Sequence, residues 1–85
     1  MDNKFDYTMK FEGVTENKAM SVGETITYVY HALQEKGYDP INQMIGYILS
    51  GDSSYITSYK DARTAIRKYE RDELLEEILK CYLSK

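Results

Sequence analysis

The segment 37–51 constrains the fold more than any other part of this chain, because it carries the start and stop signals of one short helix. Asp39 is a good N-cap, and Pro40 suits the first turn, where its missing N–H costs nothing. Gly37 and Gly51 stand where the preceding helix and this helix would end. Apolar residues recur at the spacing of a broad buried stripe: Ile41, Met44, Ile45, Ile48 and Leu49.

Helices are also predicted before and after this segment. Ser21 and Glu24 form a capping-box pattern, which indicates a helix over residues 21–36. Asp52 can cap one short turn, after which the chain re-enters a helix near residue 59 or 60. The last helix carries six apolar residues at helical spacing: Leu74, Leu75, Ile78, Leu79, Tyr82 and Leu83. We therefore predict an all-α fold, a compact small domain of about four to five helices.

Gly46 is unusual because it lies inside a predicted helix, where glycine costs about 1 kcal/mol relative to alanine. We expect another helix to approach closely at this position. A glycine without such a contact is the alternative.

The opening residues follow a different pattern, since apolar and polar residues alternate with a period of two, as in an extended strand. The apolar positions are Phe5, Tyr7, Met9 and Phe11. The rest of the sequence offers no convincing second strand, so we expect a flexible or extended N-terminal arm over residues 1–13, with strand pairing across a dimer as the alternative. Residues 14–85 form the predicted helical dimerisation domain. A domain of 85 residues buries about 60% of its unfolded surface, so a second copy of the chain would stabilise it.

Charge and hydropathy exclude several function classes. The net charge of −3 argues against a protein that coats nucleic acid or anionic membrane. No apolar run approaches the roughly 20 residues of a membrane span, and no secretory signal is present, so a cytoplasmic location without membrane insertion is expected. The single cysteine, Cys81, is expected to be a small, partly buried apolar residue.

No pattern for catalysis or metal binding is found, so we predict neither an enzyme nor a cofactor. His31 is the only histidine, and no second histidine or nearby cysteine could share a metal with it. The sequence has no glycine-rich phosphate loop and no nucleophile elbow.

Residues 60–71 place four cations on one side of a helical projection at about 100° per residue. They are Lys60, Arg63, Arg67 and Arg71. The stripe is either a solvated face neutralised by acidic neighbours such as Glu70 and Asp72, or a partner-binding surface for an acidic protein or a phosphate. Whether one helix continues through Arg71 stays open, because Asp72 could cap a new one.

Several tracts, in their order and spacing over about residues 25–83, resemble the IreB/ReoM family of small regulatory phosphoproteins in low-GC Gram-positive bacteria. The tracts are Val29-Tyr30, Leu33-Gln34-Glu35-Lys36-Gly37-Tyr38, Pro40-Ile41-Asn42-Gln43, Gly46-Tyr47, Leu49-Ser50-Gly51-Asp52, Tyr55-Ile56, Asp61-Ala62-Arg63 and Ile66-Arg67-Lys68-Tyr69-Glu70-Arg71-Asp72-Glu73. The resemblance implies an all-helical homodimer with a mobile N-terminal arm. It also implies that a membrane Ser/Thr kinase with PASTA domains phosphorylates the protein on threonine, and that a phosphatase removes this phosphate. It also implies a cytoplasmic role in cell-wall control. The unphosphorylated protein would promote Clp-protease turnover of UDP-N-acetylglucosamine carboxyvinyltransferase, directly or with an adaptor.

Thr8 matches the position of the family's phosphoacceptor, in the context Thr8-Met9-Lys10-Phe11. A merely structural threonine on a short strand is the alternative. The family's second upstream acceptor is replaced by Phe5, so double phosphorylation there is not available. The loop after Asp52 lacks two prolines and one arginine of the family pattern and offers further hydroxyls as alternative acceptors: Ser53, Ser54, Thr57 and Ser58.

Two other function classes stay open at this stage. One is a helix-turn-helix DNA binder, suggested by short helices and glycine-containing turns. The other is a structural helical dimer without a switch.

Overall fold

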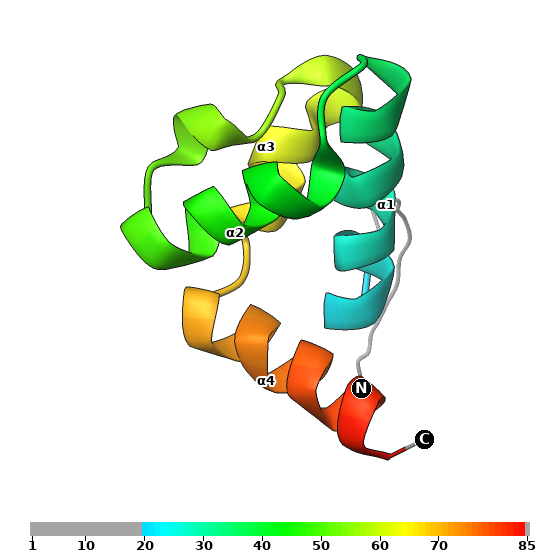
Figure 1. Ribbon diagram of the computed structural model, residues 1–85, viewed down its shortest axis with the longest axis vertical. Helices are drawn as coiled ribbons and strands as arrows, with labels where there is room; N and C mark the ends of the chain where they lie inside the picture. Colours follow the sequence, from blue (N-terminus) through cyan, green and yellow to red (C-terminus); the bar gives the residue numbers. More distant parts are fainter. Residues whose placement is uncertain (1–19, 85) are drawn as a thin grey trace, which may run out of the picture.

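The computed structural model describes residues 20–84, and this part of the chain is helical, with no strand (Figure 1). The elements are α1 (Val22–Glu35), α2 (Pro40–Ser50), two 3₁₀ turns, η1 (Ser53–Tyr55) and η2 (Tyr59–Asp61), then α3 (Ala62–Ile66) and α4 (Arg71–Leu83). The predicted all-α class is confirmed. The predicted arm and its acceptor Thr8 lie outside the described residues.

The start of α1 follows the predicted capping box. The Ser21 hydroxyl accepts a hydrogen bond from the Glu24 amide at 3.1 Å, while the Glu24 carboxylate accepts one from the Ser21 amide at 2.9 Å. These bonds satisfy two of the amides that a helix N-terminus leaves unpaired. The helix ends before Gly37, whose φ of +84° is a left-handed conformation that glycine adopts without a steric cost.

Gly46 of α2 is explained by an aromatic ring rather than by another helix. A Cβ at this position would lie 2.5 Å from the Tyr55 ring, which η1 places against α2. The expected close approach at Gly46 is therefore present, but a side chain of the 3₁₀ turn η1 makes it and not the backbone of another α-helix. The close approach is local, because only four residues separate the end of α2 from Tyr55.

The core forms where α1, α2 and α3 come together in the upper part of Figure 1, and α4 runs across the lower part. α1 packs against α2, α3 and α4. The buried apolar residues come from all four α-helices and from the segment after η1: Val29, Ala32, Leu33, Met44, Tyr47, Ile56, Ala62, Ile66 and Leu74. Only Leu74 belongs to α4, so this helix is attached through a small part of its apolar surface.

Residues 60–71 do not form one helix, which settles the question that the sequence left open at Arg71. Lys60 and Asp61 have left-handed φ values of 54° and 61°, and α3 spans only Ala62–Ile66. A new helix starts at Arg71, where the Glu70 amide donates to the Glu73 carboxylate at 2.7 Å. The helical projection failed because it assumed continuous right-handed backbone.

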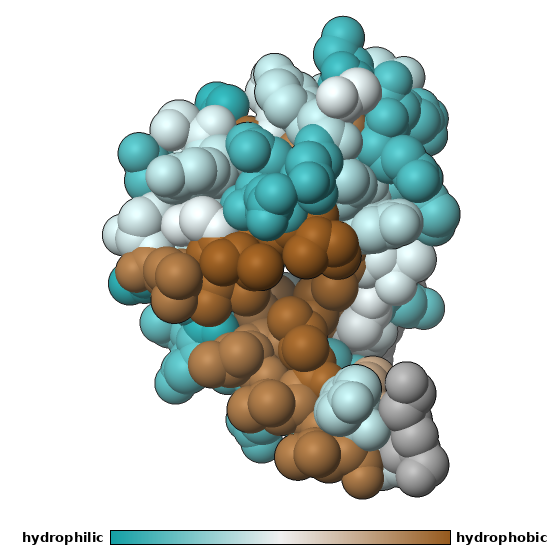
Figure 2. All heavy atoms as spheres, viewed as in Figure 1, coloured by the Kyte–Doolittle hydropathy of each residue, from teal (hydrophilic) through white to brown (hydrophobic). Residues whose placement is uncertain are grey.

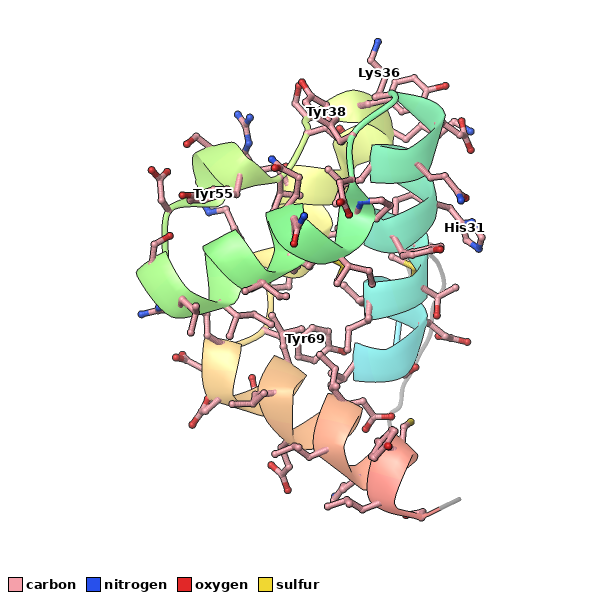
Figure 3. All side chains as sticks on the ribbon, viewed as in Figure 1. His31, Lys36, Tyr38, Tyr55 and Tyr69 are labelled. Carbon is pink, nitrogen blue, oxygen red and sulfur yellow. The ribbon has the colours of Figure 1, made fainter. Side chains whose placement is uncertain are left out.

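Tyr69 joins the connection between α3 and α4 to the beginning of the described chain. Its hydroxyl donates to the Met20 carbonyl at 2.5 Å, and its ring packs against the core. Figure 3 shows Tyr69 in the interior, between α4 and the helices above it. The connection is therefore held on the α1 side of the molecule.

Candidate functional site

A continuous apolar surface, formed by α2 and α4, is the most distinctive exposed feature of the described chain. Figure 2 shows brown residues that run from α2 down to α4, bordered by hydrophilic residues above. We call this surface the apolar face and define it by the exposed apolar side chains of the two helices: Ile41, Ile45, Leu49, Leu75, Ile78, Leu79, Tyr82 and Leu83. Leu49 is 78% exposed and Leu83 is 74% exposed, and it is the contiguity of such residues over two helices, more than any single leucine, that is unusual.

The exposure of α2 contradicts the predicted broad buried stripe. Met44 is buried and Ile48 is half-buried, but Ile41, Ile45 and Leu49 are exposed. The periodicity was read correctly as amphipathic. The single chain, however, covers only one edge of the apolar stripe.

A groove of about 480 Å³ runs along the apolar face between α1 and α2. Ile26 and Tyr30 of α1 form one wall, Ile41 and Ile45 of α2 form the other, and Ile78 of α4 contributes from below. His31 also lines it, with its ring 5.4 Å from the Tyr30 ring in an edge-to-face arrangement. A groove lined in this way is suited to apolar side chains of another protein surface.

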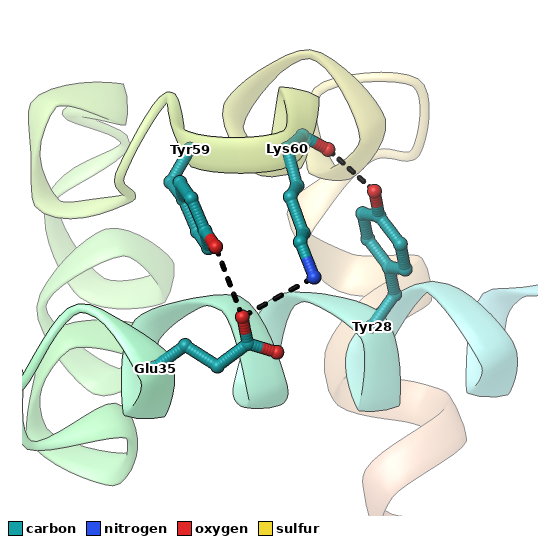
Figure 4. A network of polar contacts seen from close by, with 4 residues as sticks. All are labelled: Tyr28, Glu35, Tyr59 and Lys60. Atoms are coloured by element: carbon teal, nitrogen blue, oxygen red, sulfur yellow. Dashed lines mark hydrogen bonds and ion pairs between the residues drawn. The ribbon is translucent and has the colours of Figure 1, made fainter.

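The four cations that the sequence placed on one stripe are directed to different parts of the fold. The Lys60 ammonium pairs with the Glu35 carboxylate of α1 at 3.2 Å, and the Tyr59 hydroxyl donates to the same carboxylate at 3.1 Å (Figure 4). The Tyr28 hydroxyl donates to the Lys60 carbonyl at 2.5 Å. The hydrogen bond from Lys60 lowers the pKa of Glu35, and Glu35 in turn raises the pKa of Lys60. These contacts hold the left-handed turn at Lys60 against α1.

Two of the arginines tie chain segments together. Arg63 Nε donates to the Ile56 carbonyl at 2.8 Å, and one Arg71 Nη donates to the Ile48 carbonyl at 3.0 Å. Within residues 20–84, Arg67 is exposed and makes no side-chain hydrogen bond or ion pair. The predicted single cationic stripe is therefore absent from the described structure. The predicted partner-binding role of the four residues stays a prediction.

Other chemistry-bearing residues are dispersed. Across residues 20–84, no three side chains of His, Cys, Asp and Glu cluster in a way that could hold a metal ion. Cys81 is exposed rather than partly buried, and its thiol lies 3.5 Å from the Glu77 carboxylate, which raises the pKa of the thiol and lowers its reactivity. His31 is exposed beside the groove, and the Lys36 ammonium lies 5.2 Å from the centre of the Tyr59 ring (both residues are labelled in Figure 3).

The described helices do not present a basic reading surface. α2 contains no charged residue, and α4 contains four acidic and two basic residues. In the described range, no helix is long and apolar enough to span a bilayer.

Sequence reasoning missed Tyr28, Tyr55, Tyr69 and Glu35 as contact residues. For the three tyrosines the only signal was compositional, since the chain has nine tyrosines and two phenylalanines, and Glu35 had no signal. A hydroxyl on a packed ring allows one residue to fill space and to satisfy a backbone carbonyl. That excess could have indicated long-range hydrogen bonds but not their partners.

Comparison with known proteins places these features in one family. A sequence model described as "IreB regulatory phosphoprotein" matches residues 6–84. A UPF0297 protein of Clostridioides difficile (strain 630) is 65% identical over 85 residues, which cover 100% of this chain and 99% of that protein. The family description is regulatory and not enzymatic. With its helical body and its matched residues spanning nearly the whole sequence, the chain belongs to the IreB family of regulatory phosphoproteins.

Proposed function

We propose that this chain is the phosphorylated switch of a PASTA-domain Ser/Thr kinase and its phosphatase, and that it acts through protein–protein contacts rather than catalysis. The observation that carries this proposal is the family match over residues 6–84, which includes Thr8 and describes a regulatory phosphoprotein. The family resemblance, rather than the geometry, supports the downstream effect. That effect is control of peptidoglycan precursor synthesis through Clp-protease turnover of UDP-N-acetylglucosamine carboxyvinyltransferase.

Thr8 is the proposed acceptor on the family resemblance, and two of the four alternative hydroxyls, those of Thr57 and Ser54, have structural partners nearby. The Thr57 hydroxyl accepts a hydrogen bond from the Tyr59 amide at 3.1 Å, at the entrance to the left-handed turn. Ser54 follows Asp52, whose carboxylate accepts from the Ser54 amide at 2.9 Å and whose pKa is lowered mainly by Ser54. A phosphate on either residue would disturb a cap or stand beside a carboxylate.

A phosphate on Thr8 would add a charge of about −1.5 to −2 to a chain whose net charge is −3. Arg67 and its neighbour Lys68 are exposed, and neither has a side-chain partner in residues 20–84, so they are the cations most available to such a group. The phosphate would compete with an acidic partner for these two residues. This competition is the proposed switch.

The apolar face supports self-association as the second part of the proposal. Monomers rarely expose a contiguous apolar surface of this kind, and a patch that covers its own copy about a twofold axis gives a closed dimer. The groove between α1 and α2 would receive apolar side chains of the second copy. The structural helical dimer without a switch is the matching alternative, and it differs only in the role of Thr8.

Phosphopeptide mapping from growing cells, compared with a kinase-null strain, tests the switch. We expect phosphate on Thr8 in the parent strain, no signal in the kinase-null strain, and loss of the signal in Thr8→Ala. Thr15→Ala is the matched control, because it removes another threonine of the same N-terminal region. Full labelling of Thr8→Ala, or partner binding that is equal with and without phosphate, would refute the proposal.

A further inference from the structure

We propose that Arg71 is a positioning residue that fastens α4 to the C-terminal end of α2 and thereby shapes the apolar face. The inference gives Arg71 a role within the fold, in place of the direct partner contact that its charge suggested. Only the effect of Arg71 on self-association rests on the proposed function, because that effect requires the proposed dimer.

The contact completes the C-terminal cap of α2. The last four carbonyls of a helix lack intrahelical partners, and two of them are satisfied here by groups beyond the end of α2. The Gly51 amide donates to the Tyr47 carbonyl, and the Arg71 guanidinium donates to the Ile48 carbonyl. A cation at this end also complements the negative end of the helix dipole.

Gly51 leaves the space that the guanidinium occupies. A Cβ at Gly51 would lie 2.8 Å from the central carbon of the Arg71 guanidinium and 3.0 Å from both terminal nitrogens. Gly51 also has a φ of +78°. The glycine therefore serves two purposes, because it ends α2 in a left-handed conformation and admits the side chain that fastens α4.

The position of Arg71 within its own helix is unfavourable locally. It is the first residue of α4, at the positive end of the helix dipole, where an acidic side chain is preferred. The remaining first-turn charges, Asp72 and Glu73, follow that preference. The tertiary contact with α2 gives a physical reason for a cation at this position.

α4 packs mainly against α1 and makes few direct contacts with α2, so the bond from Arg71 is a direct link that fixes α4 relative to α2. Leu74 is the only fully buried apolar residue of α4, and it follows Arg71 by one turn. The apolar face consists of residues on α2 and on α4, so the angle between the two helices sets its shape (Figure 2). Arg71 links these two helices directly.

Hydrogen exchange and sedimentation of the full-length chain test the inference. Arg71→Gln should increase amide exchange in α4 about 5- to 10-fold, the loss of one charged hydrogen bond at an exposed site, while α1 and α3 change less than about twofold. The dissociation constant for self-association should rise by a similar factor. Lys36→Gln is the matched control, since it removes one positive charge from an exposed side chain that lies beside the Tyr59 ring and not beside α4, and it should change neither quantity.

Each other outcome overturns a defined part of the inference. Unchanged exchange in α4 would show that Arg71 does not fasten the helix. Parallel increases in α1, α3 and α4 would assign Arg71 to global stability, and Arg71→Lys, a milder change that keeps the charge, repeats the test if Arg71→Gln unfolds. If both glutamine variants weakened self-association equally, the cause would be the change in net charge and not the contact of Arg71 with α2. If the parent chain does not self-associate at any concentration, the proposed dimer fails, while the exchange comparison still decides the role of Arg71.

Discussion

α1 and α4 have similar lengths and similar apolar periodicity, yet the fold uses them in opposite ways. α1 buries Thr25, Val29, Ala32 and Leu33 against the other helices. α4 buries Leu74 alone and leaves five large apolar side chains exposed. The difference shows that an amphipathic pattern predicts an apolar face but not whether the covering surface lies in the same chain.

The largest expected effect separates the core from the apolar face. Leu33→Ala should lower the free energy of unfolding by about 2–5 kcal/mol, because Leu33 is 0% exposed and its loss leaves a cavity. Leu49→Ala, at a position 78% exposed, should change the stability of the isolated chain little. Urea denaturation at a protein concentration low enough to keep the chain monomeric measures both. If both variants lost the same free energy of unfolding, the core and the apolar face would contribute equally to the stability of the monomer, and the comparison would fail.

A charge on the apolar face should give the next largest effect. Leu79 is 49% exposed, so Leu79→Glu should leave the helical content of the monomer intact and weaken self-association at least about tenfold, because a carboxylate would be buried at the contact. Gln34→Glu adds the same charge on the exposed side of α1 and is the control. Sedimentation equilibrium gives the two dissociation constants. An unchanged dissociation constant for Leu79→Glu would show that the two copies do not meet at Leu79.

Gly46→Ala sharpens the comparison at the border between core and apolar face. The new methyl group would meet the Tyr55 ring, so the clash should outweigh the gain in helix propensity and destabilise the fold by about 1 kcal/mol. In a Tyr55→Ala background the same substitution should become stabilising. The parent, the two single variants and the double variant form a double-mutant cycle, and thermal denaturation measures the stability of each. Additive effects would show that the ring does not limit Gly46.

The smallest effect concerns the polar contact of Glu35. Its pKa is lowered from an ordinary value of 4.5, chiefly by the hydrogen bond from Lys60, so its stabilisation is complete above pH 4.5 and is lost as the pH falls through the lower, folded pKa. Glu35→Gln should therefore be slightly less stable than the parent at neutral pH, and the difference should vanish in acid. Stability measured against pH at low salt tests this sign. A difference that grows on acidification would contradict it.

The candidate site was only partly predictable from the sequence. The amphipathic residues of α2 and α4 were identified, but the pattern at Ile41, Ile45 and Leu49 was interpreted as buried. The charged residues near α3 were also identified, but Lys60, Arg63 and Arg71 were placed on one helix face. Both errors arise because a projection along one helix contains no information about what packs against it.

The sequence by itself determined where α1 and α2 begin and end. Ser21 with Glu24, Asp39, Gly37 and Gly51 act within a few residues of themselves, so their effect does not depend on the rest of the fold. Tertiary structure decided the left-handed turn at Lys60 and Asp61, the use of Tyr55 beside Gly46, and the contact of Arg71 with α2. Each of these requires groups that are close in space after folding, and single-helix periodicity cannot encode that proximity.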